Sequence, residues 1–188
     1  MTISASAGAG SAAAVARALA PHAVIEQNLA RCASAEQVCA ELSRIFNVGL
    51  TEVGLMRLEG DILNFLFPTE LRGAGFVPLS SSKAVAARTA NTRKVELFNN
   101  FVIVQHANVF ETIKLSTLGQ SNAPGANTIH KLMTAPVTDS HHNVVGVLQV
   151  CHKGLTPHDS GPDFTLNDLQ NLEIASRAVG NLTFMHAL

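Results

Sequence analysis

A histidine and a phenylalanine four residues apart, His106 and Phe110, are the first side chains in this sequence that could act on a ligand. If the stretch between them is helical, both side chains lie on one face. An aromatic ring and an imidazole on one face can stack on a flat molecule and hydrogen-bond to it. Alternatively, Phe110 belongs to the core and His106 is a structural or surface residue. His130 and Lys131 are candidates for the same kind of site.

The other histidines do not form a pattern typical of a metal site. His141 and His142 are adjacent within a run of turn-forming residues, without Cys, Asp or Glu at ligand spacing. Cys151 and His152 are neighbours on a predicted strand, so their side chains point to opposite faces. No signature supports His106 as an axial haem ligand. We therefore predict no metal ligands, and the sequence identifies no cofactor.

Covalent catalysis has no support in the sequence either. It contains no nucleophile elbow, phosphate loop, paired zinc motif or dinucleotide fingerprint. Its three cysteines, Cys32, Cys39 and Cys151, are too few and too scattered for a disulfide framework. On one helix, the Cα atoms of Cys32 and Cys39 would lie about 10 Å apart, beyond disulfide reach. We predict no catalytic residues, a protein that is not an enzyme, and a reducing cytoplasm as its location.

Composition limits the remaining classes of function. Of the 188 residues, 47% are hydrophobic and 14% are charged, and the net charge is −1, so there is enough apolar material for a core and no basic stripe for nucleic acid. No apolar run reaches the roughly 18 residues that a membrane span needs. Residues 1–20 are rich in Ala, Gly and Ser and lack the order of a secretory signal. We expect a poorly ordered tail at 1–20 and one domain over 21–188.

Two buried strands are predicted over 132–138 and 144–151. The residues between them, 139–143, are rich in turn formers. The second strand is almost wholly apolar, which is typical of a strand buried on both faces of a sheet. Gly146 inside it indicates a bulge or the close approach of another backbone.

A capped helix is predicted after these strands. Thr165 is a good N-cap, Asp168 completes a capping-box pattern, and Phe164 and Leu169 have the spacing of a hydrophobic staple. The apolar face that follows is wide enough to pack on a sheet and to offer a seam to a second helix. Its residues are Leu166, Leu169, Leu172, Ala175, Val179 and Leu182, with Ile174, Ala178 and Met185 beside them.

The upstream chain alternates between helical and strand patterns. Two helical pieces are predicted, the first over 21–31 and the second capped by Ser34, or else one helix with an irregularity near Ala33. A hairpin follows, with strands at 48–58 and 62–67, closed by Pro68. Further along, an irregular segment over 99–127 carries its own apolar residues.

The order of these late motifs resembles the C-terminal half of a GAF domain. The matching residues are the G-V-L-Q-V strand (146–150), His152-Lys153-Gly154, Phe164 and Asp168. The resemblance implies an α/β fold of the α+β type, with a central antiparallel sheet of about five or six strands. It implies a short strand (76–79), a short helix (83–90) and a further strand (94–98) in the middle of the chain. It places the N- and C-terminal helices on one face. The short helix and the irregular cover on the other face would enclose a small-molecule pocket.

The resemblance does not identify the ligand. GAF domains that bind cyclic nucleotides carry Asn-Lys, Phe and Asp-Glu at these positions, whereas this chain has His152-Lys153, Phe164 and Asp168-Leu169. Two of the five positions depart, so the motif supports the fold more than a ligand, and Lys153 and Asp168 are predicted to form a salt bridge. The Cys-His pair of bilin-binding members lies upstream of the last strands, so Cys151-His152 does not support bilin attachment.

The function implied by the resemblance is a small-molecule-binding sensory or regulatory module. It would act through a homodimer of its terminal helices or through a separate signalling protein, unless the chain is a piece of a longer one. One alternative is a ligand-free dimerisation scaffold whose pocket is filled by phenylalanines, namely Phe76, Phe98, Phe101 and Phe110. The third hypothesis is an enzyme of the free methionine sulfoxide reductase type. Such enzymes need redox cysteines in the pocket loops, but no cysteine lies between residues 75 and 127. The candidate ligand-binding residues are Phe98, His106, Phe110, His130 and Lys131.

Overall fold

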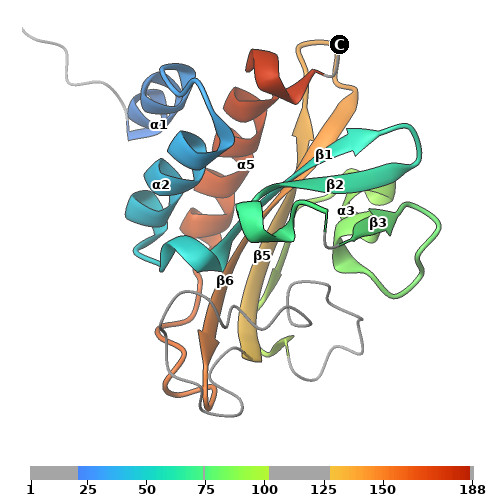
Figure 1. Ribbon diagram of the computed structural model, residues 1–188. Coiled ribbons are helices and arrows are strands. Elements are labelled where there is room, and N and C mark those ends of the chain that lie inside the picture. Colours follow the sequence, from blue (N-terminus) through green and yellow to red (C-terminus); the bar gives the residue numbers. More distant parts are fainter. Residues whose placement is uncertain (1–20, 74, 102–127, 187–188) are drawn as a thin grey trace, which may run out of the picture.

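The computed structural model describes residues 21–73, 75–101 and 128–186, and within these ranges the chain forms one six-stranded antiparallel sheet (Figure 1). The strand order is β3-β2-β1-β6-β5-β4. The predicted sheet of five or six strands is therefore confirmed, whereas the predicted tail at 1–20 lies outside the described residues. The strands are β1 (Val53–Glu59), β2 (Ile62–Phe67), β3 (Phe76–Pro78), β4 (Glu96–Phe98), β5 (Thr128–Thr138) and β6 (Val144–Gly154).

The long hairpin of β5 and β6 is the centre of the sheet. Its turn forms around Asp139, whose Oδ1 accepts hydrogen bonds from the backbone N–H groups of His141 and Asn143, both at 2.8 Å. Strand β6 is buried on both faces, as predicted. Leu148 belongs to the cluster under the helices, and Val147 belongs to the cluster on the opposite face.

Three helices cover one face of the sheet: α1 (Pro21–Ala30), α2 (Ala35–Phe46) and α5 (Leu166–Gly180), as Figure 1 shows. The predicted break between the first two helices is confirmed, because Ser34 caps α2 and accepts from the backbone N–H of Gln37. The capping box of α5 is also present, with Thr165 and Asp168 exchanging hydrogen bonds. We name the buried residues of this layer the helix-face cluster; its fully buried members include Leu29, Val38, Leu42, Leu148 and Leu172.

Helix α3 (Val85–Thr92) covers part of the opposite face. Its buried Thr89 hydroxyl lies 3.0 Å from the Thr134 hydroxyl of β5, which fixes the helix on the sheet. We name the buried residues on this side the α3-face cluster. Its members on the sheet include Met56, Leu63, Ile129, Leu132, Val147 and Cys151.

Two predicted strands differ in the structure. The strand predicted over 48–58 begins only at Val53, because residues 50–52 form a 3-10 turn, η1 (Leu50–Glu52). The Glu52 carboxylate holds that turn by accepting from the backbone N–H of Gly49 at 2.7 Å and of Lys153 at 2.6 Å. The strand predicted to begin at residue 132 instead begins at Thr128. His130 and Lys131 are therefore strand residues, not the end of a cover.

The close approach predicted at Gly146 is confirmed. A Cβ added at Gly146 would lie 2.2 Å from the backbone oxygen of Met56 on the neighbouring strand β1. Such a distance leaves no space for any side chain. None of the described helices is both long and apolar enough to cross a membrane.

Candidate functional site

Phe98, one of the predicted ligand-binding residues, lies on the edge strand β4 of the sheet. It pairs with Leu132 across β4 and β5, and its ring packs against the α3-face cluster. The Phe101 ring meets it edge-on at a centroid distance of 6.0 Å, and the Arg88 guanidinium carbon lies 5.4 Å from the Phe98 centroid. His106 and Phe110 lie outside the described residues. Of the predicted aromatic site residues, only Phe98 lies within the part of the chain that the structure describes.

His130 lies in an irregular part of β5. The pairing with β6 shifts between Ile129 and Lys131, so His130 is the extra residue of a β-bulge. Its side chain is only 5% exposed, and Nε2 lies 3.1 Å from the backbone oxygen of Gly154. Nδ1 is buried and has no hydrogen-bond partner within the described residues. If Nε2 carries the proton and donates to Gly154, Nδ1 is an unpaired acceptor.

Lys131 follows directly but contacts a different part of the molecule. It pairs with His152 on β6, and its ammonium donates to the backbone oxygen of Gly161 and lies 3.0 Å from Asp163 Oδ1. Both partners belong to the loop that precedes α5. Bulges are known to redirect side chains next to functional sites. The assignment of His130 and Lys131 to a ligand site stays a prediction, but the bulge gives the two side chains separate partners.

The ring of His152 stacks on Phe164, with centroids 4.4 Å apart and planes 10° apart. The Asn99 side chain holds the Phe164 backbone on both sides, donating to its C=O and accepting from its N–H, each at 2.9 Å. This clamp was not predicted from the sequence, because Asn99 and Phe164 are 65 residues apart. The predicted Lys153–Asp168 salt bridge is replaced by other contacts: Lys153 donates to the Thr51 carbonyl at 2.8 Å, and Asp168 binds Thr165.

Burial lowers the pKa of His152 from its ordinary value, and the charge of Lys131 acts in the same direction, whereas Glu52 and Asp168 oppose it. Because the folded state disfavours the proton, the unfolded chain binds it more readily. The free energy of unfolding is therefore expected to fall as the pH drops below 6.5, the ordinary His value, until the lowered folded pKa is reached.

The variant His152→Phe tests this pH dependence. Phenylalanine retains a flat ring for the stack on Phe164 and removes the titrating group. We expect urea denaturation between pH 8 and pH 5 to show a shallower loss of stability in the variant than in the wild type. Equal slopes in both proteins would assign the acid sensitivity to other groups.

The three cysteines are free, with Cys32 half-buried and Cys39 and Cys151 buried. Burial raises the pKa of Cys39 well above its usual range and, to a smaller extent, the pKa of Cys32. These two residues do not form a disulfide, as their spacing predicted. Cys151 is buried in the α3-face cluster. Within the described ranges, no group of three or more His, Cys, Asp and Glu residues could hold a metal ion.

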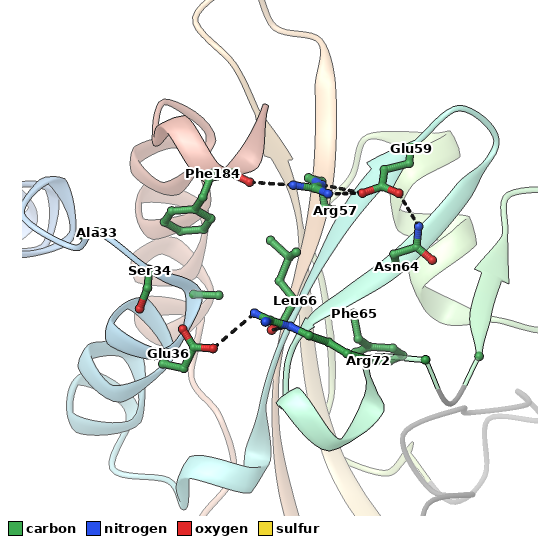
Figure 2. Close-up of a pocket in the computed structure, with 13 residues that line it drawn as sticks. Ala33, Ser34, Glu36, Arg57, Glu59, Asn64, Phe65, Leu66, Arg72 and Phe184 are labelled. Carbon is green, nitrogen blue, oxygen red and sulfur yellow. Dashed lines mark hydrogen bonds and ion pairs between the residues drawn. The ribbon is translucent and has the colours of Figure 1, made fainter. Parts of the chain in front are cut away.

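A groove on the helix face was not predicted from the sequence. It has a volume of about 620 Å³ and lies where α2 and the end of the chain meet the β1–β2 hairpin (Figure 2). Arg57 donates to the Phe184 carbonyl at 3.1 Å and binds Glu59, which accepts from Asn64 at 2.7 Å. Arg72 reaches across the groove to Glu36 at 3.2 Å. These polar contacts tie the hairpin to the helix layer.

Comparison with known proteins supports the fold but gives no sequence relative. No protein-family model matches the chain, and no curated protein matches it. Among solved structures, the GAF domain of an Acinetobacter phosphoenolpyruvate-protein phosphotransferase superposes with a TM-score of 0.58 at 14% identity, covering 85% of this chain and 87% of that one. The corresponding domain from Coxiella burnetii also gives 0.58, at 8% identity, with 85% and 88% covered.

A third structure is the GAF domain of a two-component sensor histidine kinase from Bacillus halodurans, with a TM-score of 0.50 at 15% identity and with 79% of this chain and 94% of that one covered. All three share a mixed α/β architecture with this chain. The chain therefore has the fold of a GAF domain.

Proposed function

We propose that this chain is a sensory or regulatory GAF module that binds a small molecule on the α3 side of its sheet and acts by binding, not by catalysis. Similar folds occur in a sensor histidine kinase and in phosphotransferases. The observation that carries the proposal is the buried Nδ1 atom of His130, which lacks a partner within the described residues. A buried acceptor left unpaired costs about 1–3 kcal/mol, which a ligand N–H or O–H could recover.

In this proposal the ligand is flat and largely apolar, and it donates a hydrogen bond to His130. Ile129, directly before His130, and Leu132, two residues after it, belong to the α3-face cluster. Phe98 pairs with Leu132 and presents an aromatic ring on the same side. Small-molecule sites commonly combine an apolar lining with a few polar groups that orient the ligand. In this proposal His130 supplies orientation, and Phe98 supplies a surface for stacking.

The signal would pass through the terminal helices. Helices α1 and α5 pack side by side on the other face of the sheet. We propose that these helices form a homodimer or contact a separate signalling protein. A ligand can shift that packing only if it binds one arrangement more tightly than the other.

Native mass spectrometry of the full chain, purified from its own host, tests the proposal with a matched pair of variants. In His130→Gln the side-chain amide can still donate to Gly154, but no acceptor remains at the position of Nδ1. In His130→Asn the Oδ1 atom can replace Nδ1 as the acceptor, whereas the contact with Gly154 is lost. We expect a reproducible bound mass in the wild type and in His130→Asn.

His130→Gln is expected to lose that mass or to bind the identified molecule about tenfold more weakly, the effect of losing roughly one hydrogen bond. Circular dichroism of both variants checks that the fold is intact. A wild-type chain that carries no molecule, and that is not stabilised by nucleotides, amino acids or oxyanions in a thermal-shift screen, would contradict the proposal.

The scaffold alternative has one supporting observation. Phe101 is buried and packs on Phe98, so phenylalanines fill part of this face. Phe76, by contrast, is 56% exposed on the edge strand β3 and does not fill it. If the face is empty of ligand, replacing His130 by phenylalanine removes the unpaired Nδ1 acceptor and also the Nε2 contact with Gly154. An unpaired buried acceptor costs about 1–3 kcal/mol and a hydrogen bond contributes about 0.5–1.5 kcal/mol, so we expect a small net stabilisation. Stabilisation together with no bound molecule would favour the scaffold.

A further inference from the structure

A second cavity lies at the end of the sheet, where β4 and the beginning of β5 meet the loop before α5. Its volume is about 490 Å³, within the range of small-molecule sites. Its polar side chains are those of Asn99, Asn100, Lys131, His158 and Asp163. Pro157 and Pro162 supply apolar surface.

The ion pair in this cavity is asymmetric. The Lys131 side chain is 7% exposed, whereas that of Asp163 is 69% exposed. A buried ammonium requires an anionic or carbonyl partner, because its desolvation is costly. A carboxylate on an exposed loop loses little by leaving, because exposed ion pairs contribute about 0–1 kcal/mol. The lysine is therefore the fixed member of the pair, and the aspartate is the exchangeable one.

We propose that this cavity binds the carboxylate of a small organic acid, which replaces Asp163 at the Lys131 ammonium. Asp163 itself shows that a carboxylate fits beside this ammonium, with an N–O distance of 3.0 Å. When Asp163 leaves, the cavity retains one positive charge from Lys131 and the donor groups of Asn100 and His158. One cation together with neutral donors matches a monoanion with two acceptor oxygens.

Exchange at Lys131 would act directly on the beginning of α5. Asp163 precedes Phe164, whose backbone is clamped by Asn99, and lies two residues before the N-cap Thr165. Release of Asp163 therefore loosens one of the contacts that hold this loop in place. This cavity does not involve His130, so its acid can be bound whether or not the His130 site has a ligand.

The test is a titration of the full-length chain with butyrate, followed by amide NMR shifts of residues 159–165, at constant ionic strength balanced by chloride. Butyramide, which has the same shape without the charge, is the matched control ligand. We expect saturable shifts with butyrate and none with butyramide. Asp163→Asn removes the competing carboxylate and should tighten butyrate binding at least tenfold. Asp159→Asn, in the same exposed loop, should leave the affinity unchanged.

Lys131→Gln should abolish the butyrate shifts, and Asp163→Asn keeps the inference testable if Lys131→Gln does not fold. The inference is overturned if butyrate does not bind to the wild type or Asp163→Asn, or if Asp163→Asn binds it no more tightly. Equal shifts with butyramide, or saturation by inorganic phosphate but not by butyrate, would overturn it as well. None of these results bears on the mass retained at His130, so the two proposals fail independently.

Discussion

Replacing Gly180 by valine is expected to lower the free energy of unfolding by about 3 kcal/mol or more, at the upper end of what overpacking costs. Gly180 is the last residue of α5, and it is buried against β5. A Cβ at this position would lie 1.9 Å from the backbone oxygen of Thr138 and 2.5 Å from its carbonyl carbon. Backbone atoms cannot rotate away as a side chain can, so α5 would have to move off the sheet.

Urea denaturation of Gly180→Val measures this effect, and Gly49→Ala is the matched control. The nearest atoms to a Cβ at Gly49 belong to the flexible Glu52 side chain, at 3.3 Å or more. We expect that control to change stability by no more than about 0.5 kcal/mol, as a surface substitution does. If Gly180→Val were as stable as the control, the close packing of α5 on β5 would be refuted.

Gly180 also shows why part of the fold could not be predicted from the sequence. A glycine at a helix end is normally explained by local capping, whereas this one allows contact with a strand 42 residues earlier. Gly146 could be predicted because it interrupts an otherwise apolar strand. The capping box of Thr165 and Asp168 could be predicted because all of its partners are local. Local sequence patterns therefore predict the helices and strands, whereas the close contacts between distant helices and strands were seen only in the structure.

The same distinction applies to the candidate site. His130 and Lys131 are adjacent in the sequence and were predicted to share a pocket, but a β-bulge gives them different partners. A bulge depends on how two strands pair, and no local pattern encodes it. In the same way, the first strand of the hairpin begins later than predicted, because the Glu52 carboxylate binds the backbone of Lys153, 101 residues away.

Replacing Phe164 by alanine is expected to cost about 3–5 kcal/mol, the usual range for a buried phenylalanine. Phe164 is buried in the helix-face cluster and stacks on His152. It also precedes the N-cap of α5, and Leu169, its predicted staple partner, packs against the same cluster. Removal of the ring leaves a cavity under the first turn of α5 and exposes one face of the His152 ring.

Denaturation and hydrogen exchange together separate the roles of the ring and of the clamp around it. Phe164→Leu retains most of the apolar volume and should cost less than about 1.5 kcal/mol. Asn99→Ala leaves the ring but removes both hydrogen bonds to the Phe164 backbone, with an expected cost of about 1–3 kcal/mol.

If the Phe164 ring determines stability, Phe164→Ala will be the least stable variant, and its amide hydrogen exchange will be faster throughout the first turn of α5. If Asn99→Ala is instead the less stable variant, the clamp from Asn99, directly after β4, holds the loop. The beginning of α5 would then depend on the edge of the sheet next to the Lys131 cavity. That result would make this edge, and not the helix layer, the place where a bound ligand acts on α5.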